Sequence, residues 1–365
     1  MKKILLVFGT RPEAIKMCPL VRELKSRENL KTKVCVTGQH REMLDSVLGI
    51  FGVKKDYDLA VMEKSQPLDS LTNKILSGIT EVLKREKPDT VLVHGDTTTA
   101  FAAAVASFYM KIPIGHVEAG LRTYEILSPF PEEFNRRTVS LIASYHFAPT
   151  ELAKENLLRE GVFEKSIFVT GNTGIDALRT TVSESYSSEE LELARTFRLV
   201  LLTAHRRESM GEPMRKMLRA IRRVASERED VRVLYPAHMN PNVRKIAQEE
   251  LSGCERIRIT DPLDVVDFHN VMARSYMILT DSGGIQEEAP YFGKPVLVMR
   301  DSTERPEGIA TGTLRLVGTS EESVYRGFSE LLDSADEYRK MSLAKNPYGD
   351  GFASRRIVDI LANNI

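Results

Sequence analysis

The sequence predicts an α/β protein made of two doubly wound parallel sheets, and three observations support this prediction. Short apolar runs typical of buried strands alternate with amphipathic helical stretches almost throughout. The 365 residues exceed what one compact core usually serves. The alternation starts afresh after residues 171–174, where two glycines and an asparagine suit a hinge. Two such sheets, with ligand sites at the carboxyl ends of their strands, are expected to face a central cleft.

The first half supplies apolar runs that we interpret as buried strands, separated by helical stretches with an apolar face. The expected strands are 4–8, 33–37, 90–94, 114–117, 145–148 and 167–170. The expected helices include 13–25, 68–84, 98–109 and 132–143.

The second half repeats this pattern after a polar segment, 183–192, which we expect to be a surface helix or loop. The expected strands are 199–203, 231–235, 257–259, 277–280 and 295–299, and the expected helices include 213–227 and 321–332.

Composition excludes several functional classes. The 51 basic and 51 acidic residues balance, so no polyanion-binding surface and no nucleic-acid partner are expected. Three widely spaced cysteines without a Cys-x-x-Cys pair indicate free thiols in a reducing compartment and no zinc site. The apolar run 4–8 is too short for a signal peptide, and no run approaches the roughly 20 apolar residues of a membrane span. We therefore expect a cytoplasmic protein.

The stretch 277–290 combines features of an anion-binding site. A short apolar run leads into Ser282, Gly283 and Gly284, and a helical segment follows. Glycines let the backbone approach a ligand closely, and the first amides of a helix suit a phosphate. The alternative is an ordinary strand–turn–helix connection with a serine cap. Glu288 favours a nucleotide diphosphate, because a carboxylate can take two vicinal ribose hydroxyls.

The first expected strand leads into Arg11 and Lys16, which could both point at an anion or remain solvated. No Gly-x-Gly-x-x-Gly or Walker-type motif follows this strand, so dinucleotide-binding and P-loop functions are not indicated.

Carboxylates follow the next strands of the first half. Asp96 follows one strand, where capping the next helix is the commoner role of an aspartate. Glu118 follows another and needs a partner or a task, because a buried carboxylate is costly. Glu132 and Arg136, four residues apart, could form an ordinary helical ion pair or belong to the site.

The second half places cations after its strands. His205 and Arg206 follow one strand, His238 follows the next, and Arg305 follows the strand after the glycine pair. The segment 56–58 formally matches a metal-binding Asp-x-Asp motif, but we interpret it as a surface turn. Carboxylates that hold separate pKa values, together with cations around a diphosphate, suit proton transfer coupled to release of a nucleoside diphosphate.

Ten stretches, taken together, resemble the non-hydrolysing UDP-N-acetylglucosamine 2-epimerases. They are GTRPEAIKM, QHREML, HGDTTTA, GHVEAGLRT, PFPEEFNRR, TAHRRES, HMNPNVR, LTDSGGIQEEAP, GKPVLVMRDSTERPE and NPYGDGFASRRI. The resemblance implies two Rossmann-like domains of the glycosyltransferase-B type, one covering 1–170 and the other, which binds UDP, covering 171–351. It also implies that the C-terminal helix, about 352–365, packs back on the first domain.

The resemblance implies reversible C2 epimerisation of UDP-GlcNAc to UDP-ManNAc without a cofactor or a metal ion. In the family's reaction UDP leaves C1 while the C2 proton is removed, which gives a 2-acetamidoglucal, and UDP then adds back. Two alternatives remain open. One is a 2-epimerase of a related UDP-diacetamido-uronic acid, for which extra cations near Arg122 would be the sign. The other is a retaining glycosyltransferase of the same fold, which would not need three carboxylates.

The resemblance also assigns roles to positions that match the family's motifs. The catalytic positions are Asp96, Glu118, Glu132, Arg136 and His205. The positions that bind the UDP-sugar are Arg11, Lys16, Phe268, Ser282, Gly283, Gly284, Glu288 and Arg305.

Gln39, His40, Arg206 and His238 match a second, allosteric UDP-GlcNAc site, and the resemblance further implies a homodimer. Glu42 and Ser65 depart from the pattern of members that have this second site, where Gln and Arg are expected. Because an acid would repel a nucleotide phosphate, allosteric activation of this chain stays an open question.

Overall fold

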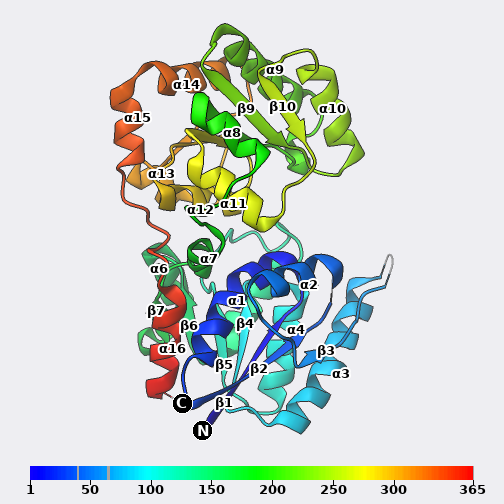
Figure 1. Cartoon of the computed structure of the whole chain (residues 1–365). Helices are drawn as coiled ribbons and strands as arrows, with labels where there is room; N and C mark the ends of the chain where they lie inside the picture. The colour runs from blue at the N-terminus through cyan, green and yellow to red at the C-terminus, as the bar shows by residue number, and fades with distance from the viewer. Residues whose placement is uncertain (39–40, 64–65, 365) are drawn as a thin grey trace. The chain divides into compact units, whose positions relative to one another are not determined.

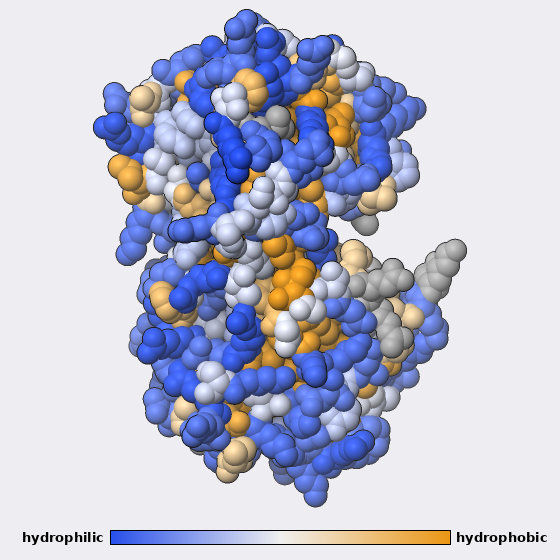
Figure 2. Space-filling view, in the orientation of Figure 1, coloured by the Kyte–Doolittle hydropathy of each residue, from blue (hydrophilic) through white to orange (hydrophobic). Residues whose placement is uncertain are grey.

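The computed structural model describes residues 1–38, 41–63 and 66–364. Its contacts divide the chain into two compact units, residues 1–180 with 348–365, and residues 181–347. Figure 1 traces the chain through them, and Figure 2 shows a face covered mostly by hydrophilic residues, with hydrophobic ones in smaller groups. Within the described ranges, no helix is long and apolar enough to cross a membrane.

The first unit contains a parallel seven-stranded sheet in the order β3-β2-β1-β4-β5-β6-β7. The chain winds outward from β1 in both directions, so the loops after β1 and β4 part at the point where the strand order reverses. The strands are β1 Lys2–Phe8, β2 Leu30–Val36, β3 Tyr57–Asp58, β4 Thr90–His94, β5 Ile114–Val117, β6 Tyr145–Ala148 and β7 Ile167–Val169.

Helices cover both faces of this sheet, which explains why β1 is apolar at nearly every position. Ile4, Leu6 and Phe8 pack toward α1 and α16, whereas Leu5 and Val7 pack toward α3 and α4. The C-terminal α16 thus returns to pack on α1 (Figure 1). The helices are α1 Arg11–Lys25, α2 Arg41–Ile50, α3 Leu68–Glu86, α4 Thr98–Tyr109, α5 Glu132–Ile142, α6 Glu151–Arg159, η1 Glu164–Ser166, α7 Thr173–Thr181 and α16 Ala353–Asn364.

The second unit repeats the plan with six parallel strands in the order β10-β9-β8-β11-β12-β13, so the strand order reverses between β8 and β11. The strands are β8 Arg198–Thr203, β9 Val231–Pro236, β10 Ile257–Thr260, β11 Met277–Thr280, β12 Val296–Val298 and β13 Leu314–Leu316. The helices are α8 Glu189–Thr196, η2 Arg207–Ser209, α9 Glu212–Glu227, α10 Pro241–Leu251, α11 Val265–Arg274, α12 Gly283–Glu288, η3 Ala289–Phe292, α13 Pro306–Thr311, α14 Glu321–Asp333 and α15 Ala335–Ser342. The predicted class, two doubly wound Rossmann-like units, is confirmed.

The prediction of a surface turn at 56–58 is wrong. Tyr57 and Asp58 form the edge strand β3, which pairs in parallel with β2. The Asp56 carboxylate accepts the Val34 amide at 2.9 Å and pairs with Lys33 Nζ at 2.6 Å. A two-residue strand bonded on one side needs no apolar alternation, so no periodic signal marked it. Asp56 therefore stabilises the edge of the sheet, and Asp58 forms part of it.

Candidate functional site

The loops at the strand-order reversal of the first unit carry the predicted carboxylates. Asp96 follows β4, and its carboxylate forms an ion pair with the Arg136 guanidinium on α5. Asn135 Nδ2 also donates to the Asp96 carbonyl oxygen at 2.8 Å. Burial raises the pKa of Asp96, and the Arg136 charge partly offsets the shift. α5 therefore holds Asp96 in place and sets its charge.

The predicted role of Asp96 as a helix cap is wrong. The N-cap of α4 is Thr97, whose hydroxyl accepts the Ala100 amide at 3.1 Å. Aspartate and threonine are both common capping residues, and only the loop geometry decides between neighbours. Asp96 is thus left available for chemistry.

Glu118 sits in a position that backbone propensity does not favour. Its φ of +63° lies in the left-handed region, which a residue with a side chain adopts rarely. Its carboxylate forms an ion pair with Lys16 on α1 and accepts a hydrogen bond from Asn172 Nδ2 at 3.2 Å. His94 Nε2 lies 3.7 Å from Glu118 Oε2. Burial lowers the pKa of His94 to about 4, so this imidazole is neutral at neutral pH.

Glu132 begins α5, and the structure does not bear out the alternative in which Glu132 forms a helical ion pair with Arg136. Arg136 instead pairs with Asp96 and, at 3.4 Å, with Glu133. Within the part of the chain that the structure describes, the buried Glu132 Oε2 has no hydrogen-bond partner. A buried carboxylate oxygen without a partner is costly, so its position requires an explanation.

Sequence reasoning missed three residues that support these carboxylates. Glu13 accepts hydrogen bonds from the Gly9 amide at 3.0 Å, the Thr10 amide at 2.8 Å and the Thr97 hydroxyl at 2.8 Å, and so ties the loops after β1 and β4 together. Burial raises the pKa of Glu13. The Thr-x-x-Glu spacing of a capping box could have revealed Glu13.

Glu133 and Asn172 carried no such signal. The Glu133 carboxylate accepts the amides of Thr123 and Tyr124, each at 3.1 Å, and so anchors the loop after Glu118.

In the second unit, Asp281 joins the two loops at the strand-order reversal. Its Oδ2 accepts the backbone amides of His205 at 2.7 Å and Arg206 at 2.8 Å. The His205 ring stacks on His238 with ring centroids 5.4 Å apart. Burial lowers the pKa of His205, and the Asp281 carboxylate acts in the opposite direction. The fully buried Asp281 carboxylate therefore fixes the backbone of the loop after β8.

Two guanidinium groups lie beside the predicted anion cradle. A Cβ added to Gly283 would lie 3.4 Å from Arg305 Nη2 and 3.5 Å from Arg206 Nη2, so both guanidinium groups are in van der Waals range of this glycine. Arg305 forms an ion pair with Glu287, and Arg206 lies 3.3 Å from Glu304. Ser282 is the N-cap residue of α12, although its side chain makes no capping bond.

The predicted nucleoside contacts lie on α11 and α12. Glu288 Oε2 is 3.6 Å from His269 Nε2, and His269 Nδ1 is 2.8 Å from the Thr181 hydroxyl. Phe268 precedes His269 with ring centroids 6.4 Å apart. The structure therefore places Glu288 beside His269, the residue that follows Phe268.

The predicted sites are gathered only in part. Arg11 begins α1 directly after the N-cap Thr10, and Lys16 lies on Glu118. Of the predicted allosteric residues, Arg206 lies beside Gly283 and His238 on His205, while Gln39 and His40 lie outside the described residues. Among residues 1–38, 41–63 and 66–364, no cluster of three or more His, Cys, Asp or Glu could hold a metal ion.

Residues 22–362 match the family model described as UDP-N-acetylglucosamine 2-epimerase. The chain is also 57% identical over 359 residues to the UDP-N-acetylglucosamine 2-epimerase of Bacillus subtilis, which covers 98% of this chain and 94% of that protein. The chain belongs to the UDP-N-acetylglucosamine 2-epimerase family. The predicted resemblance is thereby confirmed.

Solved structures of this epimerase family share the whole fold. The Neisseria meningitidis UDP-GlcNAc 2-epimerase bound to UDP-GlcNAc is 48% identical with a TM-score of 0.92, covering 99% of this chain and 100% of that one. The Methanocaldococcus jannaschii enzyme in complex with UDP-GlcNAc and UDP is 34% identical with a TM-score of 0.82, again covering 99% and 100%. The fold is thus that of the epimerase family, of glycosyltransferase-B type.

Proposed function

We propose that this chain is a non-hydrolysing epimerase that interconverts UDP-GlcNAc and UDP-ManNAc at C2 of the sugar. The observation that carries the proposal is the set of three carboxylates, Asp96, Glu118 and Glu132, in the loops after β4 and β5 and at the start of α5. Their surroundings differ: Asp96 is paired with an arginine, Glu118 with a lysine and an amide, and one Glu132 oxygen has no hydrogen-bond partner among the described residues. Relatives bound to UDP-GlcNAc support the substrate.

The proposed reaction is an elimination followed by re-addition. A carboxylate takes the C2 proton, the C2–H electrons form the C1=C2 bond of a 2-acetamidoglucal, and the C1–O electrons leave with the UDP β-phosphate. UDP then adds back to C1, and a proton returns to the other face of C2. The C2 proton has no adjacent carbonyl in the ring, so departure of the leaving group must carry the step. Stabilising the departing diphosphate is therefore as important as the base.

The two units supply the two halves of this chemistry. In the first, Glu118 is the proposed base, since Lys16 and Asn172 hold its carboxylate, while Asp96, with its raised pKa, is suited to carry a proton. In the second, Arg305 and the amides of Ser282, Gly283 and Gly284 are proposed to bind the diphosphate, with Glu288 on the ribose, Phe268 on the uracil and His205 beside the reaction. Arg11 and Lys16 are proposed as further diphosphate contacts, and Arg136 sets the charge of Asp96.

One observation bears on the uronic acid alternative. Arg122, the cation that would mark this substrate, has a fully buried side chain that donates to Glu160 Oε1 and Oε2 at 2.9 and 2.7 Å. A guanidinium with no exposed side-chain surface is not open to the carboxylate of a sugar. This contact favours the neutral N-acetyl sugar. The glycosyltransferase alternative is separated by the experiment below, because a transferase needs an acceptor.

The test is incubation of the full chain with UDP-GlcNAc in D2O without any acceptor, followed by proton NMR. We expect a new UDP-ManNAc signal and deuterium at C2 of both sugars. The Glu118→Gln variant should show neither. Free UDP with no deuterium in the remaining sugar would contradict the proposal and point to transfer or hydrolysis.

We also propose that the chain is a homodimer, as the family resemblance implies. Support comes from exposed apolar side chains around a cavity of about 670 Å³ in the first unit, including Leu141 at 83% and Phe163 at 76% exposure. Leu141→Asp should give the mass of one chain in light scattering, whereas Leu343→Asp, an equally exposed leucine of the second unit, should leave the dimer intact. A dimeric Leu141→Asp variant would remove this surface from the interface.

A further inference from the structure

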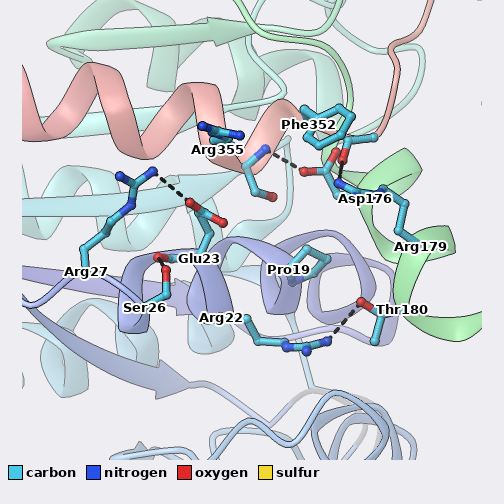
Figure 3. A pocket seen from close by; sticks show the side chains of 12 residues that line it. Pro19, Arg22, Glu23, Ser26, Arg27, Asp176, Arg179, Thr180, Phe352 and Arg355 are labelled. Atoms are coloured by element: carbon cyan, nitrogen blue, oxygen red, sulfur yellow. Dashed lines mark hydrogen bonds and ion pairs between the residues drawn. The ribbon is translucent and has the colours of Figure 1, made fainter.

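A pocket of about 750 Å³ lies in the first unit (Figure 3). Its walls come from α1, from the end of α7 and from the start of α16. On α1 the lining begins at Pro19 and continues past Arg22. Lys16 lies earlier on the same helix, about 9 Å along its axis from Arg22. No residue that we assign to the reaction lines this pocket.

Four arginines and two acids line the pocket, and both acids are already engaged. Glu23 accepts a hydrogen bond from Arg27 Nη2 at 2.9 Å. Asp176 accepts the amides of Ala353 at 3.1 Å and Ser354 at 2.7 Å, and so caps α16. Burial raises the pKa of Asp176, and the amides of the helix start and the nearby Arg179 charge act in the opposite direction. Arg27 is also paired with Asp359.

The other three arginines that line the pocket are Arg22, Arg179 and Arg355. Arg22 Nη1 donates only to the Thr180 hydroxyl at 3.0 Å, and Arg179 donates to the Gly351 carbonyl and lies 4.0 Å from the centre of the Phe352 ring. In the part of the chain covered by the structure, no ion pair joins Arg22, Arg179 or Arg355 to a carboxylate. All three line the same pocket, where like charges repel one another and an anion relieves that repulsion.

We propose that this pocket binds a small phosphorylated molecule that carries at least two negative charges. Guanidinium groups bind phosphate oxygens in pairs, and three of them from three helices can surround more than one phosphoryl oxygen. The volume is in the range of small-molecule sites and exceeds what a single phosphate fills. This proposal goes beyond the epimerase reaction and does not depend on it.

Binding there would join three segments that are distant in the sequence. α1 carries Lys16, and Asn172 lies just before α7; both contact Glu118. α16 supplies Arg355 and, through its capped start, the wall formed by residues 351–354. Thr180 also ends the first stretch of this unit, residues 1–180. A ligand in the pocket would therefore stabilise the backbone where the chain leaves the unit.

The test is hydrogen exchange of the full chain, measured by mass spectrometry, with inorganic pyrophosphate as the probe. At ten times its Kd, pyrophosphate should slow exchange about tenfold in peptides covering 19–27, 176–181 and 351–357 where binding blocks local opening. Arg22→Ala and Arg355→Ala should each weaken this protection, raising the Kd about tenfold or more. Both side chains are exposed, so neither variant is expected to unfold the chain.

Lys25→Ala is the matched control, because it removes an exposed charge from the same helix without touching the pocket. It should bind pyrophosphate as the unchanged chain does. Three results would overturn the proposal: no protection in these peptides, the same protection from sodium chloride at equal ionic strength, or equal affinity in the Arg22→Ala, Arg355→Ala and Lys25→Ala variants. Hydrogen exchange in these peptides does not depend on enzymatic activity, so the result can be interpreted even if the protein is inactive.

Discussion

The two units place their unusual residues at the same point of the same topology but supply opposite chemistry. In the first, the loops after β1 and β4 and the neighbouring segments carry acids, of which Asp96 is paired with Arg136 and Glu118 with Lys16. In the second, arginines from the loops after β8 and β12 lie beside the glycine pair that follows β11, and the buried Asp281 accepts backbone amides of the loop after β8. The topology decides where a ligand binds. The side chains decide what happens to it.

Glu118→Gln tests the first unit and should have the largest effect. Removing a general base costs about a hundredfold to ten-thousandfold in rate, and UDP affinity should stay nearly unchanged because the proposed diphosphate cradle is intact. Deuterium exchange at C2 and calorimetry with UDP measure the two quantities. Glu164→Gln, an exposed acid of the same unit paired with Lys154, is the control. Exchange near the level of the unchanged chain would remove Glu118 from the mechanism.

Arg305→Ala tests the second unit, with the reverse pattern. Loss of a charge-assisted contact to the diphosphate should raise the Kd for UDP about ten- to a hundredfold. Because Glu287 is buried and paired with Arg305, the variant should be combined with Glu287→Gln to avoid leaving a buried charge. Arg315→Ala, which removes another arginine paired with two acids, is the control. Unchanged UDP affinity in the double variant would undo the assignment.

Asp281→Asn sharpens the comparison by removing a charge while keeping the hydrogen-bond acceptor. Burial lowers the pKa of His205 and the Asp281 carboxylate raises it, so asparagine should move this pKa further down. His205 would then be neutral over a wider pH range. NMR titration of the His205 ring against pH measures this, and the His205→Asn spectrum assigns the signal. A His205 pKa that rises or stays constant in this variant would contradict the proposed effect of the Asp281 charge.

Thr97→Ala should have the smallest effect and separates capping from chemistry. Losing the cap of α4 should lower the free energy of unfolding by about 1 kcal/mol. Asp96→Asn should remove activity, and because it also takes the ion-pair partner from Arg136, its effect on stability does not report on capping. Urea unfolding and the exchange assay give both values. Unchanged stability in Thr97→Ala would contradict the assignment of the α4 cap to Thr97.

The fold was largely predictable because both sheets are buried on both faces. A strand such as β1 must then be apolar at nearly every position, and that run stands out in the sequence. The edge strand β3 lacks this constraint and was missed. Glu13 was within reach through its capping-box spacing, which is a local pattern.

The partners of the carboxylates were not predictable in the same way. Arg136 has Glu132 four residues away and Asp96 forty residues away, and it takes the distant partner. Lys16 meets Glu118, which is 102 residues away in the sequence. Such contacts depend on how the strands are ordered in the sheet, and the spacing of residues within one segment does not reveal that order. Sequence patterns therefore located the acids, whereas the structure supplied their partners.

The central claim is that UDP leaves C1 while the first unit takes the C2 proton. UDP-GlcNAc labelled with 18O in the oxygen that joins C1 to the β-phosphate tests this most directly. We expect the label to scramble into the non-bridging β-phosphate positions, seen by 31P NMR, at least as fast as UDP-ManNAc forms. Epimerisation with the label retained in the bridge would contradict the account.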